Sequence, residues 1–268
     1  MKIGICTGLP SVENQGPDII GLAEELGYDY IELPLSPLAE AGEDIYEYVG
    51  RRLAVSKLRC ECMNLFFPER VRLTGDAVDY GVVETYVERA LSRAAGVGAD
   101  VVVFGSSRAR NVPDGFPHEK AYGQLARTLQ ITSRAAVKHG VRVAIEPLNS
   151  GESNIILSLG DADKLLTAAE SPPGIYILLD FYHYMLESDS IDTLKRLARD
   201  GKIVHTHIAD HVSRGYPMSD KPEYAEVFGA LRADGYDARC SVEARFENPE
   251  DPRAEMAAGL SLLRWLFK

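Results

Sequence analysis

Cysteine is scarce in this chain of 268 residues, which has four: Cys6, Cys60, Cys62 and Cys240, each within an apolar, β-like run. A free thiol in such a run commonly behaves as a small buried hydrophobe. Cys60 and Cys62 are two residues apart, so we expect them to point the same way on one strand. No second Cys or His pair lies nearby to complete a zinc site. The cysteines are therefore predicted to be structural, without a structural zinc ion.

Long apolar runs are also missing, since none approaches the roughly 20 residues that a membrane-spanning helix requires. The chain begins MKIGIC, without a charged leader followed by a long apolar segment. These absences predict a cytoplasmic protein that does not enter a membrane.

Positive charge is in the minority, because 29 Lys and Arg face 40 Asp and Glu and give a formal net charge of −11. The densest basic stretches, at residues 51–59 and 108–110, are interrupted by apolar residues and form no basic patch. A chain of this charge repels polyanions. We therefore expect a small-molecule partner rather than nucleic acid or an anionic membrane surface.

Eight short β-branched or apolar runs recur along the chain, with helix-like stretches between them. These runs are residues 2–7, 30–35, 59–67, 101–106, 142–148, 175–183, 203–210 and 239–246. Alternating strands and helices with short connections are typical of parallel βαβ units. No G-x-G-x-x-G motif follows the first run, so the main sequence evidence for a dinucleotide-binding fold is missing. The pattern predicts an α/β protein, with residues 1–268 forming a single (β/α)8 TIM barrel domain.

Two connections stand out from the short ones. Residues 68–79 follow the third predicted strand and residues 111–117 follow the fourth. In a barrel both segments would lie over the active face, where loops serve as lids.

Polar side chains interrupt the C-terminal ends of the last four predicted strands, at Glu146, Asp180, His207 and Glu243. In a barrel these ends converge on the active face. A carboxylate in an apolar strand is costly to desolvate unless it is paired or coordinates a cation. Two Glu, an Asp and a His offer oxygen and nitrogen ligands that suit Mn²⁺, Mg²⁺ or Co²⁺. We predict one divalent ion, Mn²⁺ before Mg²⁺, Co²⁺ or Zn²⁺.

Salt bridges are the alternative explanation for these buried carboxylates. Taken singly, Glu146 or Glu243 could be half of a buried ion pair with a nearby arginine. The candidate arginines are Arg142, Arg239 and Arg245. Four separate salt bridges on four adjacent strand ends are less plausible than one metal ion, so the sequence favours the metal.

The spacing alone does not choose between His205 and His207 as the nitrogen ligand. Both histidines lie on the same face of the seventh strand, because side chains alternate with a period of two. His205 lies deeper in the strand, where we expect a histidine satisfied within the barrel interior.

Further polar residues share the predicted rim. Asn149 and Glu152 follow the fifth strand, His183 ends the sixth and Arg214 follows the seventh. Hydroxyl-rich substrates need convergent donors and acceptors of this type, although each residue could equally be an ordinary loop residue. The acidic segment 247–251 after the last strand mildly disfavours a phosphorylated substrate.

The residues Glu146-Pro-Leu-Asn149, Asp180-x-x-His183, His205-x-His207-x-x-Asp210 and Glu243 resemble the xylose-isomerase-like superfamily of sugar isomerases and epimerases. The resemblance spans nearly the whole chain and is greatest to ketose 3-epimerases of the tagatose and psicose type. Hydroxypyruvate isomerase and the inositol-pathway barrel enzymes are close alternatives. It implies metal ligands at Glu146, Asp180, His207 and Glu243, an acid/base pair at Glu146 and Glu243, and substrate contacts at Glu152, His183 and Arg214.

Three departures limit what the resemblance implies about the substrate. Ser150 stands where those epimerases typically have an arginine, and the loop between His207 and Arg214 is one residue longer. The segment 102–110 is more like uncharacterised members of the superfamily. Class and chemistry therefore transfer better than the substrate does.

The expected reaction removes a proton next to a metal-polarised carbonyl, forms a cis-enediolate and returns a proton through the second glutamate. An inosose dehydratase would share the first step and then expel hydroxide. An abasic-site nuclease would need further histidines where this chain has Glu32 and Asn64, and the acidic balance opposes a duplex. A barrel that only binds sugar would not require both glutamates. We also expect a homodimer or homotetramer.

Overall fold

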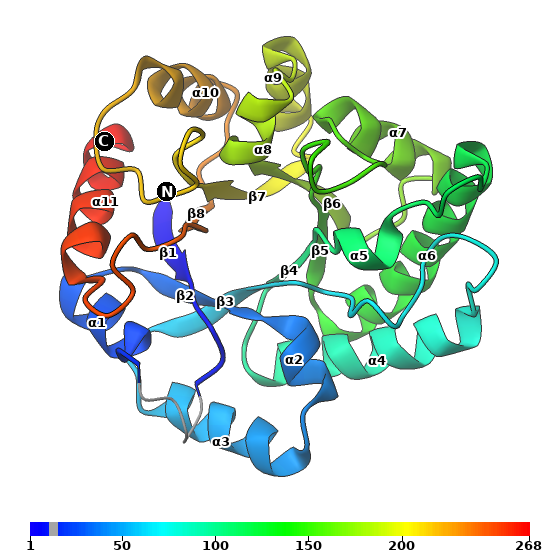
Figure 1. The fold of residues 1–268 in the computed structure, drawn as a ribbon, viewed down its shortest axis with the longest axis horizontal. Coiled ribbons are helices and arrows are strands. Elements are labelled where there is room, and N and C mark those ends of the chain that lie inside the picture. The colour runs from blue at the N-terminus through cyan, green and yellow to red at the C-terminus, as the bar shows by residue number, and fades with distance from the viewer. Residues whose placement is uncertain (11–15) are drawn as a thin grey trace.

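Eight parallel strands close into a barrel in chain order, with β1 beside β8, in the computed structural model, which describes residues 1–10 and 16–268. The strands are β1 Lys2–Cys6, β2 Tyr30–Pro34, β3 Arg59–Asn64, β4 Val101–Phe104, β5 Arg142–Ile145, β6 Ile175–Asp180, β7 Ile203–Ile208 and β8 Arg239–Val242. Figure 1 shows the helices arranged around the outside of this ring of strands. The predicted (β/α)8 barrel is therefore confirmed.

The helices between the strands carry the outer apolar layer. Within the described residues they are α1 Ile19–Leu26, α2 Leu35–Glu40, α3 Glu43–Ala54, α4 Tyr80–Gly96, α5 Ser107–Arg110, α6 His118–His139, α7 Leu159–Ala168, α8 Phe181–Leu186, α9 Ile191–Arg199, α10 Pro222–Ala233 and α11 Arg253–Leu266. Local chemistry sets their ends, as in α1: the Asp18 side chain accepts a hydrogen bond from Gly21 N, and Gly27 ends the helix at φ 88°. In this described part of the chain, no helix is both long and apolar enough to cross a membrane.

All eight strands begin at the predicted residue, but each ends earlier than predicted. Glu146 and Glu243 therefore lie one position beyond β5 and β8, where their N–H groups still donate to Phe104 O at 3.2 Å and to Ile208 O at 3.0 Å on the neighbouring strands. In β6 the strand stops at Asp180 because its carboxylate accepts a hydrogen bond from His183 N and begins α8. The polar residues thus lie where strands become loops or helices.

The barrel interior contains a small apolar cluster and is polar at its mouth. The buried interior cluster consists of Tyr30, Cys62, Val101, Val103, Ala144, Leu178 and Val204. Because side chains alternate with a period of two, the residues two positions further along face the same interior. These mouth residues include Glu32, Asn64, Gly105, Glu146 and Asp180.

The expectation that Cys60 and Cys62 share one strand face is wrong. Ile31 pairs with Cys60 and the adjacent Glu32 pairs with Cys62, so the register shifts and Glu61 is an extra residue in β3. Such a bulge breaks the alternation of faces. Cys60 therefore packs in the layer between strands and helices, whereas Cys62 packs in the barrel interior.

The connection 68–79 runs without a helix or strand from β3 towards α4, as the sequence suggested. It is tied to neighbouring segments, since Leu73 N donates to Ala109 O at 3.0 Å and Gly75 N donates to Gln124 Oε1 at 2.8 Å. In the segment 111–117, Val112 N donates to Asn154 Oδ1 at 2.9 Å. Their role as lids stays a prediction.

Candidate active site

The four predicted metal ligands lie together at the barrel mouth. His207 Nδ1 lies 3.4 Å from Glu146 Oε1, 3.8 Å from Asp180 Oδ2 and 3.6 Å from Glu243 Oε2. One ligand atom from each residue lies within 4.8 Å of the others, so the group could hold a metal ion. Four consecutive strands, β5 to β8, therefore bring three carboxylates and one imidazole to one point.

The buried atoms of this cluster fit a cation. His207 Nδ1 and Glu146 Oε1 have no hydrogen-bond partner among the described residues. Nor does any of the three carboxylates form an ion pair with a lysine or arginine in that part of the chain. Buried charges without a partner are costly. The donor set therefore matches a divalent ion better than a set of salt bridges.

None of the three arginines considered as salt-bridge partners forms an ion pair with Glu146 or Glu243 among the described residues. Arg239 Nε donates to Glu61 Oε2 at 2.5 Å, and its guanidinium also pairs with Asp100. Arg239 is the first residue of β8 and Asp100 immediately precedes β4, so this guanidinium is held at the opposite end of β8 from Glu243.

Electrostatics at the cluster show the same demand for positive charge. Burial alone would lower the pKa of His207, but the negative charges of Glu32 and Glu243 outweigh it and raise that pKa well above its ordinary value. Burial raises the pKa of Glu146, and the nearby Glu243 adds to the effect. The carboxylates that surround His207 thus favour a positive charge at this point of the barrel mouth.

Two residues that sequence reasoning missed shape the cluster from β3 and β4. Asn64 Nδ2 donates to Glu243 Oε1 at 2.9 Å, which fixes the orientation of that carboxylate. Gly105 leaves room for Glu146, because a Cβ there would lie 1.7 Å from Glu146 Oε2. The polar side chain of Asn64 at the end of the third strand was a signal for its position, whereas its contact with Glu243 and the role of Gly105 depend on the closed barrel.

The predicted rim residues form a second polar group beside the cluster. His183 Nδ1 accepts hydrogen bonds from Asn149 N at 3.1 Å and from Asn149 Nδ2 at 2.8 Å. The proton of a neutral His183 therefore sits on Nε2, which is buried and lacks a partner among the described residues. Arg214 pairs with Glu152 and lies over the Tyr182 ring, 4.8 Å from its centroid.

A cavity joins the two groups. Its lining includes Glu146, Glu243, Glu152, His183 and Arg214, together with Asn64, Leu65, Phe67, Glu69, Gly105, Ser106, Ser107, Arg108 and Leu148. Asn149 is not in this lining and reaches the cavity through His183 and Glu152. A small polar molecule in the cavity would therefore meet four glutamates, a histidine and two arginines.

Three curated proteins match part of the chain. A 3-dehydro-D-guloside 4-epimerase of Escherichia coli is 31% identical over 140 residues, which are 52% of this chain and 52% of that protein. A probable ketose 3-epimerase of Synechocystis is 26% identical over 129 residues, 47% of this chain and 44% of the relative. A hydroxypyruvate isomerase of Escherichia coli is 26% identical over 156 residues, 58% and 56% of the two chains. The aligned segments thus span about half of each relative.

Solved structures share the fold over the whole chain. The 3-keto-D-glucoside 4-epimerase of E. coli has a TM-score of 0.80 at 23% identity and covers 99% of both chains. The D-psicose 3-epimerase of Clostridium cellulolyticum, solved with D-tagatose, has a TM-score of 0.85 at 16% identity and covers 100% of both. Residues 20–266 match the family described as "Xylose isomerase-like TIM barrel". The chain belongs to this family.

Proposed function

We propose that this protein is a divalent-metal-dependent epimerase or isomerase of a small sugar-like hydroxy ketone, of the ketose 3-epimerase type. The convergence of Glu146, Asp180, His207 and Glu243 beside a polar cavity is the observation that carries the proposal. The names of the matched relatives, which are epimerases and an isomerase, support the same class. Mn²⁺ is the proposed ion, because carboxylate-rich sites with one imidazole suit it.

Glu146, Asp180, His207 and Glu243 would hold the ion, which when bound polarises a substrate carbonyl and makes the adjacent C–H bond acidic. The two glutamates supply the proton transfers, since both line the cavity. One accepts the proton from the C–H bond, and the other returns a proton to the opposite face. Two bases on opposite sides of a planar carbon thus invert its configuration.

The rim residues would bind the substrate oxygens. The Nε2–H group of His183 faces the cavity without a partner among the described residues, so it can donate to a hydroxyl or to a developing oxyanion. Arg214, oriented by its ion pair with Glu152, supplies positive charge to the same region. Asn149 would act by holding His183 in the tautomer that donates.

A keto-glycoside is the second candidate substrate, favoured by the match to the 3-dehydro-D-guloside 4-epimerase. A ketose and a keto-glycoside both place a C–H bond next to a carbonyl, so the same glutamates serve either. Four predictions from the sequence go with this proposal. Residues 1–268 act as a single domain, the protein is cytoplasmic, it forms a homodimer or homotetramer, and it does not bind nucleic acid.

Deuterium exchange tests the shared first step. Protein loaded with Mn²⁺ is incubated in D₂O with unphosphorylated ketoses, 3-keto-glycosides and hydroxypyruvate, and after the ion is removed with chelator the substrates and products are followed by NMR. We expect metal-dependent exchange at a carbon next to a carbonyl in at least one substrate, and the labelled carbon identifies the epimerised position. Protein stripped of metal is the control. Absence of exchange with every substrate, despite bound metal, would contradict the proposal.

Glutamine variants test the two-base mechanism. In Glu146→Gln and Glu243→Gln, an amide oxygen can still ligate a metal ion but cannot accept the proton. We expect both variants to retain measurable Mn²⁺ while turnover falls by at least about 100-fold, the lower end of a general acid–base contribution. Metal content by mass spectrometry and turnover are measured separately. Turnover close to that of the unaltered protein in either variant would refute the mechanism.

A further inference from the structure

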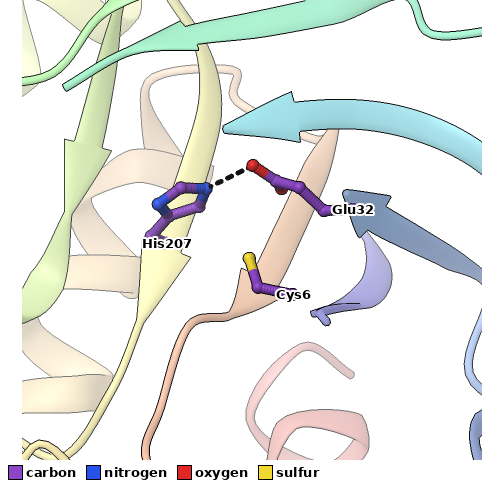
Figure 2. Close-up of side chains that lie close together, drawn as sticks. All are labelled: Cys6, Glu32 and His207. Carbon is purple, nitrogen blue, oxygen red and sulfur yellow. Dashed lines mark hydrogen bonds and ion pairs between the residues drawn. The ribbon is translucent and has the colours of Figure 1, made fainter. Parts of the chain in front are cut away.

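A buried carboxylate on β2 lies directly behind the candidate metal ligand His207. Glu32 is 0% exposed, and its Oε1 accepts a hydrogen bond from His207 Nε2 at 3.0 Å. Figure 2 shows the two side chains facing each other across the barrel interior. The other carboxylate oxygen, Oε2, accepts from His205 Nε2 at 2.8 Å and from Ser241 Oγ at 2.6 Å. Glu32 thus receives three hydrogen bonds.

These bonds fix where the ring protons lie. A neutral imidazole carries one proton, and the Nε2 atoms of His205 and His207 both face an acceptor. In His207 the lone pair is therefore on Nδ1, the atom that faces Glu146, Asp180 and Glu243. His205 Nδ1 lies 3.8 Å from Cys62 Sγ, whose thiol can donate to it.

Glu32 differs from an ordinary buried ion pair. In the described part of the chain it contacts no lysine or arginine, whereas Glu61 on β3 pairs with both Lys2 and Arg239. The carboxylate of Glu32 is therefore held by hydrogen bonds from two imidazoles and a hydroxyl. One of these imidazoles, His207, belongs to the candidate metal centre.

We propose that Glu32 is a positioning residue that holds His207 in its Nε2–H tautomer and directs the Nδ1 lone pair to the cation. The inference rests on the proposed function, because it requires a cation at the cluster. Carboxylates that accept the second ring N–H of a metal-ligating histidine orient the ring and raise its basicity, and their loss typically costs about 10–100-fold in metal affinity.

Cys6 also lies beside Glu32 and His207, so these three residues could form a second site of their own. Figure 2 shows the Cys6 thiol close to the pair. Glu32 Oε1 and His207 Nε2 already form a hydrogen bond with each other at 3.0 Å, so of the three facing groups the Cys6 thiol alone is free to ligate an ion. The geometry therefore favours the positioning role.

The unaltered protein provides the first test. It is labelled with ¹⁵N in its histidine rings and loaded with Zn²⁺, which is diamagnetic, and the ring nitrogens are assigned by NMR. We expect His207 to carry its proton on Nε2 and to ligate through Nδ1. A proton on Nδ1, or ligation through Nε2, would overturn the proposal without any variant having to fold.

Glu32→Gln provides the second test. The amide oxygen should occupy the position of Oε2, which accepts two hydrogen bonds, and so place the NH₂ group against His207 Nε2. That ring must then accept at Nε2 and carry its proton on Nδ1, where it blocks the cation. We expect Mn²⁺ affinity, measured by electron paramagnetic resonance of the free ion, to fall by about 10–100-fold.

Glu61→Gln is the matched control, because it removes another buried carboxylate whose contacts are with Lys2 and Arg239. We expect its Mn²⁺ affinity to stay within about twofold of the unaltered protein, because it leaves the bonds of His207 intact. If Glu32→Gln also keeps its affinity, the positioning role fails while the proposed function stands. If the unaltered protein binds no divalent ion, the proposed function fails and the inference fails with it.

Discussion

Two neighbouring residues, Arg110 and Gly105, determine the position of Glu146. Arg110, a fully buried guanidinium, donates to the main-chain oxygen of Glu146 at 2.7 Å and to that of Phe104 at 2.8 Å. Gly105 has no side chain and so leaves the space that the Glu146 carboxylate occupies. The buried guanidinium of Arg110 and the absence of a side chain at Gly105 thus determine where the Glu146 carboxylate lies.

Replacing Gly105 with alanine should displace that carboxylate, because the new Cβ would lie 1.7 Å from Glu146 Oε2. Misplacing a reacting group by about 1 Å costs on the order of 100-fold in rate, so we expect turnover to fall by at least that factor and Mn²⁺ binding to weaken. Gly123→Ala is the control, since a Cβ there meets nothing within 4 Å. It should leave both measurements unchanged. Normal turnover in Gly105→Ala would show that Glu146 is free to move.

At the scale of strands and helices, the sequence predicted the existence and order of the elements well. Strand starts follow from apolar runs, and all eight agree. Strand ends depend on whether the backbone continues the strand or begins the next element, which the apolar pattern does not show. At Asp180, for example, the side chain caps α8 and so ends β6. The bulge at Glu61 was also not predictable, because it depends on the pairing of β2 with β3 rather than on β3 itself.

The candidate site was predictable to the extent that strand-end chemistry determines it. The four proposed ligands come together because parallel strands converge, and depth along β7 separates His207 from His205. The supporting contacts were not predictable, since Asn64, Gly105 and Glu32 act across strands that are distant in sequence. Their roles depend on closure of the barrel, which only the three-dimensional structure displays.

At the scale of the whole molecule, closure of the barrel brings a buried carboxylate between cations from its first and last strands. Glu61 Oε1 accepts from Lys2 Nζ on β1 at 2.6 Å, and Oε2 accepts from Arg239 Nε on β8 at 2.5 Å. Burial alone would raise the pKa of Glu61, but the hydrogen bonds from Lys2 and Arg239 outweigh it and lower that pKa. The group therefore couples stability to pH.

The sign of this coupling follows from the lowered pKa. Glu61 stabilises the fold fully above its unfolded pKa, and the contribution is lost as the pH falls through the lower, folded value. We expect Glu61→Gln to melt at least about 2–4 °C below the unaltered protein at pH 7, the shift that 1 kcal/mol produces in a domain of this size class. This difference in melting temperature should shrink as the pH is lowered from 5 to 3.

Glu84→Gln, which removes an exposed ion pair with Arg134, is the control and should melt close to the unaltered protein at pH 7 and at low pH. Thermal unfolding followed by circular dichroism measures all three proteins, and a gap that stays constant with pH would mean that Glu61 contributes through packing rather than through its charge.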